Sequence, residues 1–306
     1  MTRYLLALVL IAAGAVPMLG QQEGPARTQA LLQAVSKNAA VPSANDVTVK
    51  VNGKKTQLEG LTPVPATGAQ VAILIDDGLR LSVGRELSTL QDFVRKLRPG
   101  TEIYIGYMQN GRIIPTQEFT TDYADAAHTL RLPLGSPGLS ASPYLCLSDF
   151  VKKWPRGAEG SPAPKARFVL MITNGVDPYN GSTSITNQNS PYVETAIRDA
   201  QRAGVSVSSI YYANAGFRGH RGSFSGQSYL SQVSQGTGGT AYFQGLGNPV
   251  SIDPFLKEFT KAISETYIAT FPAPSGKDLV QVKFSTTLPG TKLQAASQVR
   301  PGTKIE

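Results

Sequence analysis

Two apolar segments, each followed by a polar turn, constrain the fold of this chain more than any other feature. Residues 71–76 read Val-Ala-Ile-Leu-Ile-Asp and run into a glycine-containing turn, beyond which a helical pattern begins. Residues 167–175 repeat the arrangement, with an apolar run that ends in Thr-Asn-Gly. Apolar runs of this length, bounded by turn signals, are typical of fully buried strands. Because ligands of open parallel sheets lie at the carboxyl ends of the strands, Asp76 and Asn174 are expected to share one edge, here called the rim.

Strand-like and helix-like segments alternate through the middle of the chain. Strands are predicted at 71–76, 101–108, 112–119, 167–174, 205–212 and 240–243. Helices are predicted at 84–97, 122–130, 143–154, 190–203 and 254–264, with a further helix that ends at Val233. This alternation predicts an α/β fold with a doubly wound, mostly parallel sheet and helices on both faces. The segment 112–119 follows an Asn-Gly turn and is predicted to be an antiparallel edge strand.

The two ends of the chain fall outside this alternation. Asn52-Gly53 predicts a β-hairpin near the N-terminus, and the tail contains three short alternating segments bounded by Pro or Gly. Because chain termini often lie close together, these segments are expected to form a small β appendage. A weak helical pattern occurs at 28–36. The predicted organisation is a signal peptide at 1–20, a mobile lead-in at 21–45, the hairpin at 46–64, a central domain at 68–265 and a C-terminal β extension at 266–306.

The first 20 residues have the pattern of a secretory signal peptide. Arg3 supplies the positive charge, residues 4–16 form a short apolar core, and Gly20 stands where cleavage is expected. The apolar core is shorter than the roughly 20 residues that a membrane-spanning helix needs. We therefore expect an exported protein, periplasmic or extracellular, with no transmembrane anchor after cleavage. An uncleaved membrane anchor is the alternative.

Composition and spacing argue against several functional classes. The chain has 41% hydrophobic residues and a net charge of +8, but its basic residues are scattered and do not alternate with aromatic ones, so no nucleic-acid partner is expected. Cys146, the only cysteine, lies among apolar residues, and neither His128 nor His220 has a nearby Cys or His at metal-binding spacing. There is no glycine-rich phosphate loop and no Gly-x-Ser-x-Gly turn. We expect neither an enzyme nor a cofactor.

Several phrases occur in an order that resembles the von Willebrand factor A (VWA) domain. They are the strand that ends at Asp76, the segment 172–175 with Asp177, the run Ala-Gln-Arg-Ala-Gly-Val at 200–205, and Thr-Gly-Gly at 237–239. The match extends over roughly residues 47–300. It is most similar to the exported VWA-related proteins of soil bacteria (acidobacterial type), in which β segments flank the domain. The resemblance implies a VWA-like fold and a role in binding other proteins.

The resemblance also implies a metal-ion-dependent adhesion site, in which an Asp-x-Ser-x-Ser turn, a Thr and a later Asp hold Mg²⁺. This chain keeps Asp76, but Gly78 and Arg80 stand at the two serine positions, and Asn174 replaces the later Asp. The Thr position falls on Ser142 or within two residues of it. The substitutions remove hard oxygen ligands and add a fixed positive charge that repels a divalent cation. The site is therefore expected to be degenerate and to bind no metal.

The rim is the expected partner-binding surface. Arg80 either pairs with Asp76, or presents its planar fork to an acidic group of a partner, or points into solvent while Asp76 caps the turn. The polar loop 178–189 is either a recognition loop or a flexible surface loop. The candidate rim residues are Asp76, Asp77, Arg80, Ser142, Asn174, Asp177, Arg218 and Arg221. They predict an exported adhesion or recognition module for a protein or cell-surface component, acidic partners included. A structural or assembly factor of the envelope, acting through its β appendage, and an unrecognised envelope hydrolase remain as alternatives.

Overall fold

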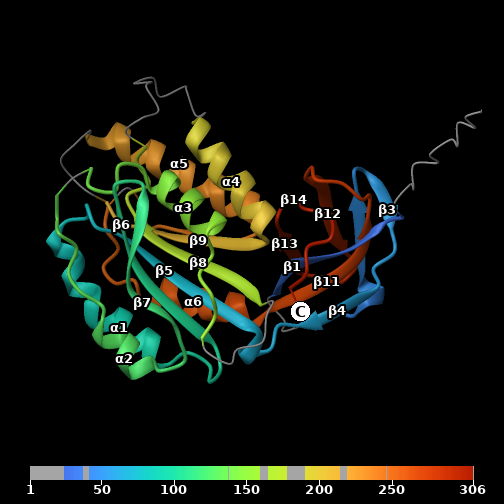
Figure 1. Ribbon diagram of the computed structural model, residues 1–306, viewed down its shortest axis with the longest axis horizontal. Coiled ribbons are helices and arrows are strands. Elements are labelled where there is room, and N and C mark those ends of the chain that lie inside the picture. The colour runs from blue at the N-terminus through green and yellow to red at the C-terminus, as the bar shows by residue number, and fades with distance from the viewer. Residues whose placement is uncertain are drawn as a thin grey trace, which may run out of the picture.

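A six-stranded sheet forms the centre of the fold in the computed structural model (Figure 1). The structure describes residues 24–36, 41–136, 138–158, 165–177, 190–213, 219–245 and 247–305. The strands of this sheet are β5 (Ala69–Asp76), β6 (Glu102–Gln109), β7 (Arg112–Thr120), β8 (Ala166–Thr173), β9 (Val205–Tyr211) and β10 (Ala241–Tyr242). Their order is β10-β9-β8-β5-β6-β7. Every neighbouring pair is parallel except β6 with β7, which pair antiparallel. Strand β7 is thus an antiparallel edge strand, as predicted.

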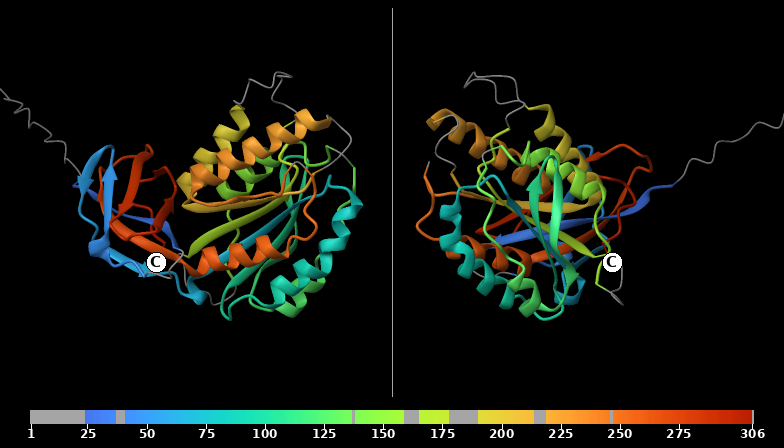
Figure 2. Two further views of the ribbon diagram at one scale, coloured as in Figure 1. Left: turned by 180° about the vertical axis from the view of Figure 1, so that it is seen from behind. Right: turned by 60° about the vertical axis from the view of Figure 1, so that its left-hand side comes forward.

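Helices cover both faces of this sheet (Figures 1 and 2). They are α1 (Leu87–Arg95), α2 (Tyr123–His128), α3 (Pro143–Lys152), α4 (Pro191–Ala203), α5 (Gly219–Thr237) and α6 (Asp253–Ser264), with short 3-10 helices η1 (Ala44–Asp46), η2 (Ala66–Gly68) and η3 (Leu81–Glu86). Successive residues of β5 point to opposite faces. Ile73 therefore packs in one core with α1, α2 and α6, and Leu74 packs in the other with α3, α4 and α5. The predicted doubly wound α/β architecture is confirmed.

The chain changes direction across the sheet between β5 and β8. From β5 it proceeds outward through β6 and β7, and then it returns to β8 and continues to β9 and β10 on the other side. Counted in chain order within the sheet, the strands lie 3-2-1-4-5-6, which is the doubly wound order. The carboxyl ends of β5 and β8 are Asp76 and Thr173. A crevice at this switch point is where such sheets bind their ligands.

Two four-stranded antiparallel sheets form the appendage, to one side of the central domain (Figure 2). Their orders are β13-β1-β11-β4 and β14-β12-β2-β3. The strands are β1 (Ala26–Ser36), β2 (Val47–Val51), β3 (Lys54–Thr56), β4 (Gly60–Pro63), β11 (Thr266–Ala273), β12 (Val280–Thr286), β13 (Thr291–Ala295) and β14 (Gln298–Val299). As predicted, Asn52-Gly53 joins an antiparallel hairpin, and N-terminal strands pair with C-terminal ones. The hairpin does not continue to residue 64, because β4 leaves it to pair with β11.

The prediction of a mobile lead-in with a helical pattern at 28–36 is wrong. Residues Ala26–Ser36 form β1, which lies between β13 and β11 in its sheet. Every second side chain of this strand is buried, including Leu32. Alanine, leucine and glutamine favour helices when local propensity decides, but here pairing with two distant strands outweighs that propensity.

Candidate functional site

Asp76 ends β5 at the switch point and is buried. Its Oδ2 accepts a hydrogen bond from Thr173 Oγ1 at 2.8 Å, and its Oδ1 accepts one from the Gly78 amide at 2.9 Å. The hydroxyl of Ser140 donates a further hydrogen bond. Burial raises the pKa of Asp76 above its ordinary value, although these three hydrogen bonds oppose the rise. The carboxyl group of Asp76 therefore links β5 to β8 and to the loop before α3 through hydrogen bonds.

Asp77 is also buried, but the guanidinium of Arg131 neutralises it. Arg131 binds it with both arms, Nη1 to Oδ1 and Nη2 to Oδ2, each at 2.8 Å. The Gln109 side chain and the Leu134 amide also donate to this carboxylate. Burial alone raises the pKa of Asp77, but these donors outweigh it and hold the pKa below its ordinary value. The two neighbouring carboxyl groups are therefore shifted in opposite directions.

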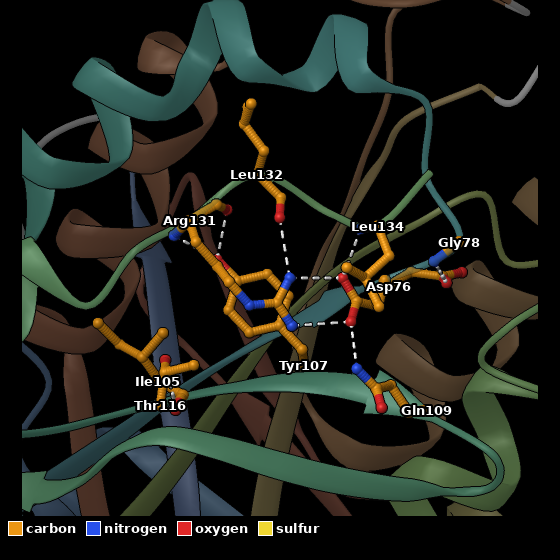
Figure 3. Close-up of polar contacts among 10 residues, drawn as sticks. Asp76, Gly78, Ile105, Tyr107, Gln109, Thr116, Arg131, Leu132 and Leu134 are labelled. Carbon is orange, nitrogen blue, oxygen red and sulfur yellow. Dashed lines mark hydrogen bonds and ion pairs between the residues drawn. The ribbon is translucent and has the colours of Figure 1, made fainter. Parts of the chain in front are cut away.

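Arg131 is held in place from two sides. Its guanidinium lies over the ring of Tyr107 (Figure 3), with the guanidinium carbon 3.8 Å from the ring centre. Its Nη1 also donates to the carbonyl of Leu132 at 2.8 Å. The Tyr107 hydroxyl donates to the Arg131 carbonyl at 2.6 Å and accepts from its amide at 2.8 Å. These contacts fix the loop after α2 across the carboxyl ends of β5 and β6. The sequence carries no local signal for this role of Arg131.

The predicted rim residues Asn174, Ser142 and Asp177 lie at the carboxyl ends of the strands, but each forms a hydrogen bond to a group other than Asp76. Asn174 directly follows β8, yet its Oδ1 accepts from the Val176 amide at 2.8 Å, and Thr173 is the residue that reaches Asp76. Ser142 is a buried N-cap of α3 that accepts from the Tyr144 amide at 3.3 Å. Ser140, two residues earlier, contacts Asp76 instead. Asp177 is buried and accepts from the hydroxyl of Ser190, the N-cap of α4, at 2.6 Å.

Arg80 does not pair with Asp76. The side chain of Arg80 is exposed at the start of η3, and no ion pair joins it to Asp76 among the described residues. Asp76 is instead buried, and its oxygens accept from Thr173 and Gly78. Arg218 and the loop 178–189 lie outside the described residues, and of Arg221 only the helical backbone of α5 is described.

The residues at the switch point do not fit the ligand shell of Mg²⁺, which needs near-octahedral oxygen ligands. Asp76 receives hydroxyl and amide donors, and Asp77 is bound by a fixed cation at 2.8 Å. Gly78 and Arg80 offer no hydroxyl. In the part of the chain that the structure describes, no group of three or more His, Cys, Asp or Glu is placed to hold a metal ion.

Exposed leucines border this neutralised site. Leu81, after β5, is 60% exposed, and Leu132 and Leu134, in the loop after α2, are 46% and 61% exposed. The segment after β5 and the loop after α2 are in contact at two glycines. A Cβ atom added to Gly84 would lie 2.5 Å from Leu132 Cδ2, and one added to Gly135 would lie 3.5 Å from Leu81 Cδ2. We call Leu81, Leu132 and Leu134 the leucine patch. Neighbouring exposed apolar side chains of this kind mark interaction surfaces.

Replacing Asp76 by Asn tests its internal role. Because the folded pKa of Asp76 is raised, its contribution to stability is fully present below the unfolded pKa and is lost as pH rises through the folded pKa. Asparagine does not ionise, so Asp76→Asn loses no stability as pH rises, and its amide oxygen can still accept the hydrogen bond from the Gly78 amide. The free energy of unfolding is expected to change by less than about 1 kcal/mol at neutral pH. Relative to wild type, the variant should gain stability as pH rises from about 4 to 7, measured by urea unfolding. A loss of several kcal/mol at neutral pH would contradict this.

Comparisons with known proteins found similarity to solved structures only. No protein-family model and no curated protein matches the chain. An aerotolerance-related membrane protein from Bacteroides fragilis is 11% identical with a TM-score of 0.42, over 64% of this chain and 98% of that one. Proximal thread matrix protein 1 from the mussel byssus is 14% identical with a TM-score of 0.43, over 67% and 48%. The SpRpn10 VWA domain is 10% identical with a TM-score of 0.39, over 62% and 94%. Since these TM-scores are below 0.5, the α/β fold rests on the strand order itself, which is consistent with a VWA-like arrangement.

Proposed function

We propose that this protein is an exported protein-interaction module with a VWA-like domain, which binds a partner protein through the leucine patch and Arg80 without a divalent metal. The observation that carries the proposal is the exposure of three leucines beside a switch point whose two carboxyl groups are satisfied internally. Switch-point rims of doubly wound sheets are sites of ligand binding. An apolar surface at such a rim fits a macromolecular partner better than a small polar ligand.

The chemistry of the rim explains why apolar contact is the proposed mode of binding. Asp76 is turned inward to Thr173, and Asp77 is held by Arg131, so neither carboxylate is available to anchor a bridging cation. The leucine patch gains about 25 cal/mol for each Å² of apolar surface that a partner covers. Arg80, exposed beside Leu81, supplies a bidentate donor for a carboxylate at the edge of the contact. An apolar centre with a charged edge is the usual anatomy of a protein interface.

Export and a non-enzymatic role belong to the same proposal. Export is supported by the signal-peptide pattern of residues 1–20. Among the described residues, no helix has the length and apolar character to cross a membrane. A binding role rather than catalysis is supported by the state of the candidate reactive groups. Cys146 is buried, and burial, with the nearby Asp76 charge, raises the pKa of its thiol to about 12, so the nucleophilic thiolate is suppressed.

Site-specific photo-crosslinking in the producing cell tests the proposal. A photoreactive amino acid replaces Leu134, which is 61% exposed in the leucine patch, or Val250, which is 93% exposed outside it. We expect one discrete adduct with a partner protein from position 134 and none from position 250. Leu132→Ser, added to the variant with the photoreactive residue at position 134, should weaken the adduct severalfold, because it removes adjacent apolar contact. Equal adducts from both positions would overturn the proposal.

The rival role as an envelope assembly factor predicts a different result from the same experiment. The photoreactive residue is then placed at Lys54 in β3, an exposed position at the edge of the appendage. Under our proposal this position gives no discrete adduct. A discrete adduct from position 54 together with none from position 134 would assign the interaction to the β appendage and refute a role of the rim.

A further inference from the structure

A basic cavity lies at the end of the central sheet opposite the rim. It has a volume of about 860 Å³ and is lined by the last turns of α3 and α4, the start of β8 and the final segment 300–305. Arg167 marks the start of β8, and Gly204 marks the end of α4 just before β9 begins. The C-terminal end of the chain thus lies between the central domain and the appendage (Figure 1). The cavity is distinct from the leucine patch, which lies at the opposite, carboxyl ends of the strands.

The charges that line the cavity are not balanced. Seven of its 16 lining residues are Lys or Arg, and one is acidic. That residue, Asp199, is already engaged by the Ser148 hydroxyl at 2.6 Å and by Lys152 and Arg202, each at 3.6 Å. Two further lining cations, Lys153 and Lys165, are paired with Asp149 and Glu102, which lie outside the lining. The remaining three, Arg167, Arg300 and Lys304, form no ion pair within the described ranges. The cavity therefore carries a local excess of positive charge that attracts an anionic ligand.

Arg167 indicates which kind of anion the cavity suits. Its guanidinium is partly buried, 5.2 Å from the centre of the Trp154 ring, and its Nη1 donates to the Ala203 carbonyl at 3.3 Å. A guanidinium withdrawn from water is costly unless an anion compensates it. Its planar fork matches the two oxygens of a carboxylate. Trp154 adds apolar surface to this site.

The backbone around the cavity favours a peptide over a phosphate. The ends of α3 and α4 that face it are C-terminal ends. Helix C-termini present carbonyl acceptors, which the N–H groups of a peptide can use, whereas a phosphate brings acceptor oxygens and is bound by amide donors at helix N-termini. Carbonyl acceptors suit the N–H groups of a peptide, and the surrounding cations suit its acidic side chains. The volume is also larger than a single carboxylate or phosphate needs.

We propose that this cavity binds an acidic peptide segment of a partner protein, with Arg167, Arg300 and Lys304 as the cations that hold its carboxylates. The Arg167–Trp154 pair forms the apolar wall against which the peptide packs. This is a second interaction surface, at the opposite end of the sheet from the leucine patch. Its test is independent of the photo-crosslinking test, so either proposal can fail while the other stands.

The protein carries its own reporter for this test, because Trp154 in the cavity wall is the only tryptophan of the chain. Fluorescence of Trp154 is followed while the purified protein is titrated with a short oligoglutamate peptide, and in parallel with oligoglutamine of equal length. We expect a saturable change with oligoglutamate, no change with oligoglutamine, and weaker binding at higher ionic strength. Arg300→Glu with Lys304→Glu should weaken binding about tenfold or more, because two exposed cations become repulsive.

A matched control separates the cavity from the overall charge. Lys54→Glu with Lys55→Glu makes the same change in net charge on exposed residues of β3 and should leave the affinity within about twofold. Three results would overturn the proposal: no saturable change in the unaltered protein, equal weakening by the control pair, or saturation by inorganic phosphate at the same concentration as the peptide. Displacement of the peptide by an equally charged oligonucleotide at a lower concentration would likewise refute the peptide assignment.

Discussion

Arg131→Met is expected to lower the free energy of unfolding by about 3 kcal/mol at neutral pH, as measured by urea denaturation. The substitution keeps an apolar stem over Tyr107 but removes both donors to Asp77, whose side chain is fully buried. An uncompensated buried carboxylate costs about 3 to 5 kcal/mol. The lower figure applies because the Arg131 side chain is 35% exposed, so water screens part of the interaction.

Two comparison variants isolate the cause of this loss. Arg95→Met removes the same kind of side chain from an exposed pair with Asp92, and should change stability by less than about 0.5 kcal/mol. Asp77→Asn combined with Arg131→Met removes both charges and should recover part of the loss. If the double variant is as unstable as Arg131→Met alone, the buried charge is not the cause.

The pH dependence of the same variant has a definite sign. The folded pKa of Asp77 is lowered in the wild-type protein, so its stabilising contribution is present above the unfolded pKa and is lost as pH falls through the folded pKa. Without Arg131, burial becomes the dominant influence, and the variant should instead lose stability as pH rises. The difference between the two proteins is therefore largest at neutral pH and shrinks as pH falls through the raised folded pKa of Asp77 in the variant towards its lowered folded pKa in the wild-type protein. A constant difference across this range would contradict the assignment.

The sequence predicts the central sheet well because its strands carry unambiguous signals. The run at 71–76 is apolar at every position before Asp76, since both faces of β5 are covered by helices. The carboxyl ends of such strands locate the switch point without knowledge of any contact. Strand β1 lacks this signal, because its buried face includes small and polar residues such as Thr28 and Ser36. Its place depends on pairing with strands near the other end of the chain.

The polar contacts of the switch point are less predictable than its location. Asp77 and Arg131 are 54 positions apart, and Arg131 is one of 29 basic residues with no distinguishing neighbour in the sequence. The sequence instead directs attention to Arg80, which is closer along the chain to Asp76 but points to solvent. Which cation neutralises which carboxylate is decided by how the loop after α2 folds across β6. That loop is fixed by Tyr107, a contact between distant residues.

Gly226→Ala is expected to lower the free energy of unfolding by about 2 to 3 kcal/mol, because helix α5 crosses the turn after β8 at backbone contact. A Cβ atom at Gly226 would lie 2.1 Å from the carbonyl oxygen of Asn174. The turn itself has no room to move, since a Cβ atom at Gly175, where φ is +65°, would lie 2.6 Å from the Gly226 carbonyl. The better helix propensity of alanine, about 1 kcal/mol, offsets only part of the overlap.

Urea unfolding of Gly226→Ala is compared with that of Gly247→Ala, a position with no atom within 4 Å of the added Cβ, where a change below about 0.5 kcal/mol is expected. Equal stability of the two variants would mean that α5 does not press on the turn. The contact lies on the β8 side of the switch point, whereas the leucine patch lies on the β5 and β6 side. The folded fraction of Gly226→Ala should therefore still give the Leu134 adduct. Loss of that adduct in a folded variant would show that both sides of the switch point move as one unit, and that partner binding depends on the packing of α5 as well as on the leucines.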